Sequence, residues 1–529
     1  MTAKTLMIQG TASSVGKSLL VAALCRIFSQ DGLRVAPFKS QNMALNSFVT
    51  AEGGEMGRAQ VVQAIAAGLA PRIEMNPILL KPEADHRSQV VVMGSSRGSM
   101  GFRAYRALRD QLLVTVEAAL GRLRAEHDLV IIEGAGSPAE INLKAGEIVN
   151  MRIARLAGAP VILTGDIDRG GVFAHLVGTL SLLDDDERAF VKGIFINRFR
   201  GDISLLKSGL DFLEERTGVP VLGVIPFVPD LRIPEEDSVW LERLPRAHLP
   251  SAGAVVEVAV IQLPHVANFD EFAPLAAEPG VALRYVSTRD ALGDPDLVIL
   301  PGTKTTLADL RWLRGRGLHD AITALAGRGA AVIGICGGYQ MLGRVVEDPT
   351  GSESMVGDAA PGLSLLPIDT VFAQTKATHQ VRAEVAVAAG PGLLAGCIGV
   401  LTAYEIHMGR SIVDEAPGAF APAFTVNARS GHAPEPGTEP DGLLAAGGRI
   451  MGTYLHGLFE NASLRRTVLR NLAAFKGRET APEAASWGQL ATLDEELNRL
   501  AQAVRTSIDL PRLYKIAGLA LEPTRQRPG

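Results

Sequence analysis

One pattern recurs along most of this sequence: a short apolar run followed by a stretch with helical periodicity. Most of the runs are apolar at every position rather than at alternate positions, which is typical of strands buried on both faces of a sheet. Strands that alternate with helices form parallel sheets covered by helices, so the pattern predicts an α/β protein. The expected strands are residues 5–10, 33–39, 129–136, 160–168, 191–199, 220–227, 255–263, 281–287, 296–302, 330–338 and 448–457.

The pattern is interrupted in the middle of the chain. Residues 228–253 contain prolines at positions 229, 234, 245 and 250 and few strand-forming residues, as linkers do. We therefore expect two doubly wound, mostly parallel-sheet domains and, because the last residues are polar and helical in pattern, a helical C-terminal tail. The predicted divisions are a first domain over 1–235, a linker over 236–253, a second domain over 254–462 and the tail over 463–529.

Composition excludes several classes of protein. A net charge of −5 over 529 residues gives no general attraction to nucleic acid. Three scattered cysteines, Cys25, Cys336 and Cys397, are too few for a disulfide framework or a zinc cluster and favour a reduced, cytoplasmic setting. We see neither a signal peptide nor an apolar run of about 18 residues, so we expect no membrane partner.

The first functional motif is "GTASSVGKS", residues 10–18, between an expected strand and an expected helix. A loop in this position turns backbone N–H groups and a helix N-terminus toward phosphate oxygens. Gly10 and Gly16 allow the tight path, Lys17 reaches the terminal phosphates, and the Ser18 hydroxyl is a ligand for Mg²⁺. The motif predicts an ATP site, to which Thr11 and Val15 also belong.

Acidic residues stand at the ends of two neighbouring expected strands. Glu133 in "IIEGAG" ends one of them, and Asp166 in "GDIDRGG" ends the next. Ligands of open α/β sheets bind at the carboxyl ends of the strands. Glu133 is therefore the predicted partner of Ser18 in holding Mg²⁺, and Asp166 is a candidate for the phosphoryl-transfer site.

The motif "FKSQNMALNS" follows the second expected strand and adds uncharged donors and a cation. Lys39 is placed to neutralise charge on a transferring phosphoryl group. Gln41 and Asn42 are candidates to hold the acceptor carboxylate or the ribose. Glu55 is a further candidate metal ligand.

The second functional motif is "GICGGYQMLG", residues 334–343, after an apolar strand. Gly-x-Cys-x-Gly is the sequence of a nucleophile elbow with cysteine in place of serine. The turn presents Cys336 at a helix N-terminus, which favours the thiolate. The N–H groups of Gly337 and Gly302 are the predicted oxyanion donors.

A cysteine nucleophile needs a base, and the predicted one is His456 in "GTYLHGLFEN", with His407 in "YEIHMGR" as the alternative. The Cys-Gly-Gly-x-Gln pattern and the late histidine resemble class I glutamine amidotransferases, in which the pair releases ammonia from glutamine. Members of that class commonly carry Glu two residues after the histidine. Here Leu458 occupies that position, and Glu460 lies two residues further on.

The phosphate loop has five residues between its first glycine and Gly-Lys, where the usual pattern has four. This spacing resembles the loop of dethiobiotin synthetases, although Ala12 stands where those enzymes usually carry Asp. In those enzymes a carboxylate receives the γ-phosphate and becomes an acyl phosphate. The resemblance implies an ATP-dependent amidoligase in the first domain, beside the glutamine amidotransferase of the second.

Further motifs are spread over nearly the whole chain: "PFKSQNMALNSFVT", "EMGRAQVVQA", "MNPILLKP", "GDIDRGGVFA", "INRFRGD", "LPHVANFDEFAPL", "LPGTKTTLADLRWLR", "GICGGYQMLG", "YEIHMGR" and "GTYLHGLF". With these motifs, the sequence resembles the cobyric acid synthase family. The resemblance implies that ATP and glutamine convert the b, d, e and g carboxylates of a corrinoid, adenosylcobyrinic acid a,c-diamide, to amides. Arg58, Lys81, Arg198 and Arg200 are candidate cations for that substrate. Alternatives left open are a cobyrinic acid a,c-diamide synthase, a lipid II isoglutaminyl synthase and a non-enzymatic nucleotide switch.

Overall fold

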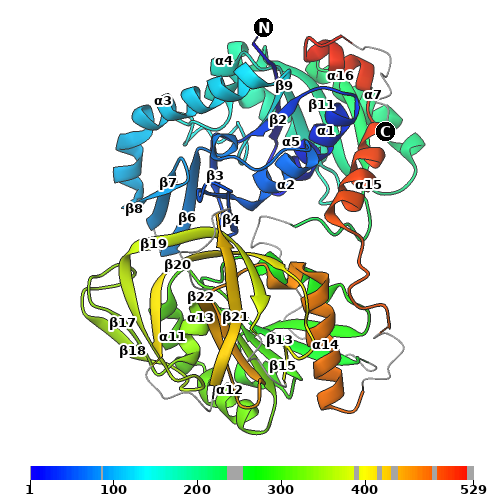
Figure 1. Ribbon diagram of the computed structural model, residues 1–529. Coiled ribbons are helices and arrows are strands. Elements are labelled where there is room, and N and C mark those ends of the chain that lie inside the picture. Colours follow the sequence, from blue (N-terminus) through cyan, green and yellow to red (C-terminus); the bar gives the residue numbers. More distant parts are fainter. Residues whose placement is uncertain are drawn as a thin grey trace. The chain divides into compact units, whose positions relative to one another are not determined.

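The computed structural model describes residues 2–84, 87–234, 254–386, 392–413, 420–430, 439–478 and 485–520. The chain forms two compact units (Figure 1). The first comprises Met1–Ala44, Glu55–Glu235 and Ala491–Gly529, and the second comprises Leu45–Gly54 and Glu236–Leu490. Both are built on largely parallel sheets with flanking helices, which confirms the predicted α/β class. The predicted linker, 236–253, lies outside the described residues.

The first unit is organised by a six-stranded parallel sheet in the order β12-β11-β10-β1-β9-β2. Each strand corresponds to one of the six apolar runs in the first half of the sequence. Because β9 and β10 flank β1, the loops at the carboxyl ends of these three strands lie together, where ligands of open α/β sheets bind. The strands are β1 Lys4–Gly10, β2 Val35–Phe38, β9 Leu129–Glu133, β10 Val161–Asp166, β11 Val191–Phe199 and β12 Val221–Pro226.

A second, smaller sheet in this unit has the order β3-β6-β7-β8 and was not predicted. Strand β3 has three residues and β8 is largely exposed, so neither contains a continuous apolar run that would indicate a strand. The strands are β3 Gln41–Met43, β6 Ile78–Ala84, β7 Arg87–Val92 and β8 Ser95–Gly101, with β5 Glu55–Gly57 nearby in sequence. The helices are α1 Lys17–Gln30, α2 Arg58–Ala66, α3 Phe102–Glu126, α4 Met151–Ala157, α5 Val172–Leu182, α6 Asp185–Arg188 and α7 Lys207–Thr217.

The end of the chain completes the first unit. Helices α15 (Leu493–Arg505) and α16 (Leu510–Ile516), red in Figure 1, pack beside α1. The apolar face of α15, which includes Leu497 and Val504, is buried in one cluster with Leu24 and Phe28 of α1. The described part of the C-terminal region is thus helical, as expected, and its last two helices belong to the core of the first unit.

The second unit contains one large mixed sheet. Its parallel part, β14-β13-β15-β16-β23, contains the predicted strands of the second half. Successive residues of β13 fall into two apolar clusters, one on each face, as in a sheet covered on both sides. The strands are β13 Val256–Ile261, β14 Val281–Val286, β15 Leu297–Leu300, β16 Ala331–Ile335 and β23 Ile450–Thr453.

The sheet continues through mostly antiparallel strands that the sequence analysis did not identify. In β19, Ile368, Thr370 and Phe372 are buried while the residues between them are partly exposed, so the segment lacks the continuous apolar run used to find strands. These strands are β17 Val345–Asp348, β18 Asp358–Pro361, β19 Ile368–Val385, β20 Leu401–Val413, β21 Phe420–Arg429 and β22 Glu439–Ala445. The unit also contains β4 Ser47–Val49, which is not a strand of this sheet. The helices are α9 Ala273–Ala276, α10 Arg289–Leu292, α11 Thr306–Gly315, α12 Leu318–Gly327, α13 Gly337–Leu342 and α14 Ala462–Phe475.

Among the described residues, no helix has the length and apolar character needed to cross a membrane.

Candidate active sites

The phosphate loop joins the central strand β1 to helix α1. Gly16 has a left-handed backbone conformation (φ 95°), and a Cβ atom there would collide with the Asn197 amide. Asn197, at the end of β11, donates a hydrogen bond of 2.8 Å to the carbonyl of Val15. At the other end of the loop, the Thr11 N–H donates to the carbonyl of Thr164 at 3.0 Å. Both ends of the loop are therefore fixed to neighbouring strands. Asn197 was not predicted, although it lies in the motif "INRFRGD".

Lys17 crosses the loop. Its Nζ donates to the carbonyl of Ala12 at 2.9 Å and to the carbonyl of Gly136, in the turn after β9, at 3.1 Å. A Cβ atom on Gly10 would lie 3.0 Å from this ammonium and 2.6 Å from the Val15 side chain, so only glycine leaves room for the crossing. The Lys17 ammonium is thus held between the phosphate loop and the turn that follows Glu133 at the end of β9.

Glu133 is 1% exposed and has polar partners on both carboxylate oxygens. Oε1 accepts hydrogen bonds from Ser18 Oγ at 2.8 Å and Lys39 Nζ at 2.9 Å, and Oε2 accepts from Gln63 Nε2 at 2.5 Å. Burial opposes ionisation, but the Lys39 ammonium and these hydrogen bonds hold the pKa of Glu133 below its usual range. The structure therefore brings together three of the candidate residues, Ser18, Lys39 and Glu133, and adds Gln63 from α2.

The predicted acceptor-side residues have partners of their own. Gln41 accepts a hydrogen bond from the Tyr105 hydroxyl. Asn42 is buried and donates to Gln60 Oε1 at 2.9 Å. Gln60, like Gln63, lies on α2 and approaches Glu133, with its Nε2 atom 3.5 Å from Oε2. Asn42 is therefore connected to the Glu133 cluster through Gln60.

The charged residues of "GDIDRGG" pair with those of "INRFRGD". Asp166 is 5% exposed and accepts from Arg198 at 2.9 Å, while Asp168 accepts from Arg200 at 3.0 Å. The Arg200 guanidinium also lies over the Phe227 ring, 3.4 Å from its centroid. These pairs join the ends of β10 and β11.

Two further candidate residues form a buried pair. Glu55 and Lys81 are 1% and 3% exposed, and Lys81 Nζ lies 2.5 Å from Glu55 Oε1. Arg58, at the start of α2, is also buried. Neither of the two candidate cations, Lys81 and Arg58, is exposed.

The residues fit a magnesium ion bound together with nucleotide phosphates. Among the described residues, no group of three or more His, Cys, Asp and Glu side chains forms a metal cage. Mg²⁺ in phosphate-transfer sites is commonly bound by one or two protein oxygens, with phosphates and water supplying the rest. Ser18 Oγ and Glu133 Oε1, 2.8 Å apart, provide such a pair.

In the second unit, Cys336 stands at the turn between β16 and α13. Its backbone has φ 52° and ψ −109°, a strained conformation for a residue with a side chain. Gly338 packs against the carbonyl of Leu300, and Gly334 packs against Gly338, so side chains at either glycine would collide with backbone. The two glycines of Gly-x-Cys-x-Gly therefore permit the close approach of α13 to β15 and β16. This is the geometry of a nucleophile elbow.

His456 lies just after β23, is 2% exposed and shares a hydrogen bond with Cys336. Its Nδ1 lies 3.1 Å from Glu271 Oε1, and the other oxygen of Glu271 accepts the Gly457 N–H at 3.1 Å. Burial lowers the pKa of the imidazole, but Glu271 and Cys336 outweigh it and raise the pKa of His456 to about 10. Cys336, His456 and Glu271 thus form a Cys-His-Glu triad by geometry.

Glu271 was missed by the sequence analysis. It lies in "LPHVANFDEFAPL", a motif noted for its resemblance but given no chemical role. Leu458, where Glu is common, is 1% exposed in the core, and Glu460 is exposed at the surface. The imidazole of His456 is instead held by Glu271, which lies in the loop after β13, 185 residues earlier in the chain.

The remaining histidine candidate has different partners. His407 stacks on Tyr454 with ring centroids 3.8 Å apart, and its Nδ1 contacts the carbonyl of Gly409 at 2.8 Å. His456 stacks on Tyr404, with centroids 5.3 Å apart. It is therefore His456 that the structure brings to Cys336.

The two glycines predicted as oxyanion donors lie around this triad. A Cβ atom on Gly302 would be 2.7 Å from Cε1 of His456. A Cβ atom on Gly337 would be 2.7 Å from the side chain of Thr303, the residue after Gly302. The strand-end turn after β15 and the start of α13 therefore face each other across the elbow.

Known families match both units. Residues 6–239 match the family described as the CobQ/CobB/MinD/ParA nucleotide binding domain. Residues 257–464 match the family described as the CobB/CobQ-like glutamine amidotransferase domain. Fold, sites and matches together define a glutamine amidotransferase fused to a nucleotide-binding domain, an enzyme of the ligase type.

The chain belongs to the cobyric acid synthase family of cobalamin biosynthesis. It is 54% identical to the cobyric acid synthase of Sorangium cellulosum over 98% of this chain and 99% of that protein. The corresponding protein of Moorella thermoacetica is 55% identical over 98% of each chain. That of Pelotomaculum thermopropionicum is 51% identical over 100% of this chain and 99% of that protein.

Proposed function

We propose that the chain amidates the b, d, e and g side-chain carboxylates of adenosylcobyrinic acid a,c-diamide, giving adenosylcobyric acid. Each amidation consumes one ATP and one glutamine. The observation that carries the proposal is the coexistence of two complete sites, a phosphate loop facing Glu133 and a Cys-His-Glu triad. The full-length relatives, which are cobyric acid synthases, support the corrinoid as the acceptor.

The first unit activates the acceptor. A carboxylate oxygen of the corrinoid attacks the γ-phosphorus of ATP, the bond to the β,γ-bridging oxygen breaks, and ADP leaves as an acyl phosphate forms. Lys17 and the loop N–H groups orient the phosphates, and Lys39 lies next to Glu133, where it can offset charge on the transferring group. Ammonia then attacks the acyl carbon, phosphate leaves, and the amide remains.

Ser18 and Glu133 are the residues that would hold Mg²⁺. When bound, the ion supplies charge neutralisation and orientation of the phosphates. Lys39 shares the same Glu133 oxygen, so the ammonium already compensates the buried carboxylate. Gln63 fixes the second oxygen and thereby the plane of the carboxylate.

The second unit supplies the ammonia. The Cys336 thiolate attacks the side-chain amide carbon of glutamine, the imidazolium of His456 gives its proton to the departing nitrogen, and water then hydrolyses the glutamyl thioester. Glu271 keeps the imidazole oriented and stabilises its cationic form. Gly302 and Gly337 are the proposed donors to the oxyanion.

The decisive experiment compares acceptors. The enzyme is incubated with ATP, glutamine and either adenosylcobyrinic acid a,c-diamide, cobyrinic acid or lipid II, and the products are followed by mass spectrometry. We expect four successive mass decreases of about one dalton for the a,c-diamide, since each step replaces OH by NH₂. Amidation of cobyrinic acid at a and c, or of lipid II, would contradict the proposal and support one of the two amidotransferase alternatives. Absence of any glutaminase activity would favour a nucleotide switch.

A further inference from the structure

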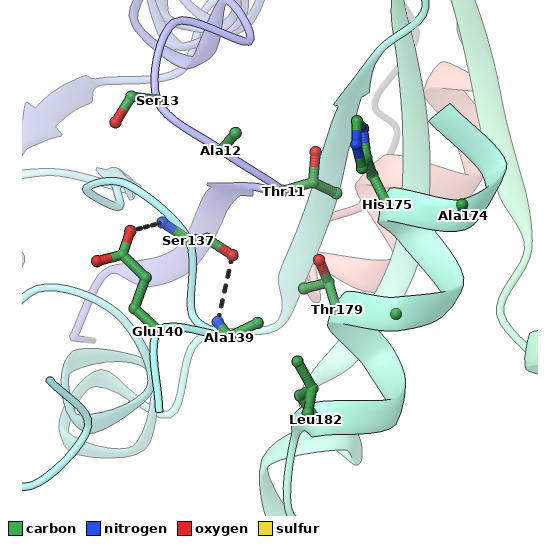
Figure 2. A pocket seen from close by; sticks show the side chains of 11 residues that line it. Thr11, Ala12, Ser13, Ser137, Ala139, Glu140, Ala174, His175, Thr179 and Leu182 are labelled. Atoms are coloured by element: carbon green, nitrogen blue, oxygen red, sulfur yellow. Dashed lines mark hydrogen bonds between the residues drawn. The ribbon is translucent and has the colours of Figure 1, made fainter. Parts of the chain in front are cut away.

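A cavity of about 430 Å³ lies beside the phosphate loop in the first unit. Figure 2 shows it between the loop, the turn after β9 and one face of α5. Its walls include Thr11, Ala12 and Ser13 of the loop, Ser137 of the turn, and Gly178 and Thr179 of α5. The volume is in the range of small-molecule sites.

The cavity adjoins the end of the loop where the terminal phosphate belongs. Lys17, which in such loops contacts the β- and γ-phosphates, points at the carbonyls of Ala12 and Gly136. Ala12 and Ser137, the neighbour of Gly136, line the cavity. A group that occupies the cavity is therefore next to the phosphate to be transferred.

The chemistry of the walls suits an aliphatic arm that ends in a carboxylate. The hydroxyls of Thr11, Ser13 and Thr179 are neutral donors, while Ala139 and Leu182 are apolar. The acid among the lining residues, Glu140, directs its carboxylate at the Ser137 N–H, at 3.3 Å, on the side away from α5 in Figure 2. The first turn of α5 carries no acid.

Exposed apolar side chains occur in the cavity wall and in the segment that follows it in the sequence. Leu182 is 50% exposed, and the segment that continues from Glu140 carries Ile141, 62% exposed, and Leu143, 41% exposed. This segment is tied to the end of α5, because the ammonium of Lys144 lies 2.6 Å from Asp184, two residues beyond Leu182. Gathered apolar residues of this kind mark ligand or partner surfaces.

We propose that the cavity receives the carboxylate-bearing arm of the corrinoid, while the macrocycle contacts the exposed side chains of Leu182 and of the segment after Glu140, Ile141 and Leu143. This inference rests on the proposed function and locates its acceptor. Gly178 is the point at which the wall can be tested. It lies inside α5, where glycine is a poor helix former, yet a Cβ atom there meets nothing within 4 Å.

The experiment measures binding of the a,c-diamide corrinoid and of ATP to wild type, Gly178→Leu and the control Ser181→Leu. Ser181 is an exposed residue of the same helix and does not line the cavity. We expect Gly178→Leu to weaken corrinoid binding by at least about tenfold, with ATP binding, glutaminase activity and the control unchanged. Thr179→Val, which keeps the shape and removes the hydroxyl, should weaken corrinoid binding less.

The outcomes separate the two proposals. If wild type binds no corrinoid, the proposed function fails. If wild type and a folded Gly178→Leu bind it equally, the function stands and the cavity assignment is overturned. The assignment is also overturned if Gly178→Leu weakens ATP binding instead, because the cavity is then part of the nucleotide site.

A separate observation concerns residues 45–54, which belong to the second unit although β3 before them and β5 after them belong to the first. Asn46 is fully buried and accepts the Phe269 N–H at 3.2 Å, and Asn268 accepts the Ser47 N–H at 2.9 Å. The two asparagines thus hold the turn that begins at Asn268 and carries Glu271. Phe48 packs on Tyr404, with ring centroids 5.5 Å apart.

We infer that this segment positions the triad from two sides. Asn46 and Asn268 fix the turn that carries Glu271, and Phe48 supports Tyr404, which stacks on His456. The strand that precedes this segment, β3, carries Gln41 and Asn42. The candidates for holding the acceptor carboxylate are therefore followed directly in the sequence by the segment that supports the triad. Phe48 is therefore a positioning residue for glutamine hydrolysis.

The test compares Phe48→Ala with Phe48→Tyr, which keeps the ring. We expect Phe48→Ala to lower glutamine-dependent kcat by about tenfold, with KM for glutamine little changed and ammonia-dependent amidation retained. Phe48→Tyr should restore most of the activity. Equal loss of both nitrogen routes would indicate a general structural defect, and unchanged glutaminase activity in Phe48→Ala would show that the segment does not position the triad; either result overturns the inference.

Discussion

The phosphate loop and the cysteine turn are built alike: a strand of a parallel sheet, a tight turn and a helix. They differ in which residues have a positive φ angle. In the first unit these are Ser14 and Gly16 of the loop, with φ 57° and 95°, and in the second it is the nucleophile Cys336 itself, with φ 52°. Glycine adopts such angles freely, whereas a residue with a side chain is destabilised by about 1–3 kcal/mol. In the phosphate loop the strained side chain is therefore not the catalytic lysine, whereas in the cysteine turn the reactive residue itself is strained.

The charges of the two sites also contrast. In the first, a buried carboxylate, Glu133, is kept ionised by a lysine and neutral donors. In the second, a buried imidazole, His456, is kept protonated by a carboxylate and a sulfur. One unit thus holds a buried anion beside the phosphate loop, and the other holds a buried acid beside the cysteine. Variants at the cysteine site should therefore lose glutamine-dependent amidation alone, whereas variants at the phosphate loop should lose amidation with either nitrogen source.

The largest expected effect is at the nucleophile. Cys336→Ala should reduce glutamine-dependent amidation by at least about 10⁴-fold, because no other group can form the thioester. Ammonia-dependent amidation should persist at a rate near wild type. The measurement is corrinoid amide formed with glutamine or with ammonium chloride as the nitrogen source. Loss of both glutamine-dependent and ammonia-dependent amidation would contradict the assignment of ammonia release to the second unit and carboxylate activation to the first.

The complementary change is Lys17→Ala. It should reduce amidation by about 10³-fold with either nitrogen source, since neither can act without an acyl phosphate. The basal glutaminase activity, measured as glutamate released without corrinoid, provides the control. Amidation that survives with ammonia would show that Lys17 is not needed for activation of the carboxylate.

Glu271→Gln tests the triad member that was not predicted. It should lower glutaminase kcat by about 10²-fold, because the amide neither stabilises the imidazolium nor selects its tautomer. Glu460→Gln is the matched control, since Glu460 is the exposed acid nearest in sequence to His456. A larger effect at Glu460 than at Glu271 would reverse the assignment.

The smallest expected effect is on how the free energy of unfolding changes with pH. The pKa of His456 is raised from 6.5 to about 10, so its contribution to the free energy of unfolding is complete below pH 6.5 and is lost as pH rises through about 10. Urea unfolding near both pH values should show a smaller decrease for Glu271→Gln than for wild type. An identical decrease would mean that Glu271 does not set this pKa.

Features that depend on local sequence were predictable. The buried parallel strands are continuous apolar runs, and the loop and the elbow are short motifs whose glycines are required by close packing. The proximity of Ser18 and Glu133 was also predictable, because the loop that leads to Ser18 follows one parallel strand, β1, and Glu133 ends another, β9. Ligand-binding residues of such sheets gather at the carboxyl ends of the strands. These are consequences of chain periodicity and sheet topology.

Other features depend on contacts that no local pattern encodes. The alternation in β19 reflects one covered and one partly exposed face, which a search for continuous apolar runs passes over. Glu271 meets His456 across 185 residues, so its role follows from the fold alone. Asn197, Gln60 and Gln63 are uncharged residues whose roles depend on tertiary packing.

The return of the chain to the first unit has a consequence for synthesis. Helix α15, which covers α1, lies beyond residue 491, whereas the preceding part of the same unit ends at residue 235. At a translation rate of about 5–20 residues per second, the growing chain leaves this apolar face uncovered for roughly 10–50 seconds while the glutaminase is made. The first unit is thus the first to be synthesised and the last to be completed. A ribosome that stops early therefore releases a product in which the apolar face of α1 is exposed.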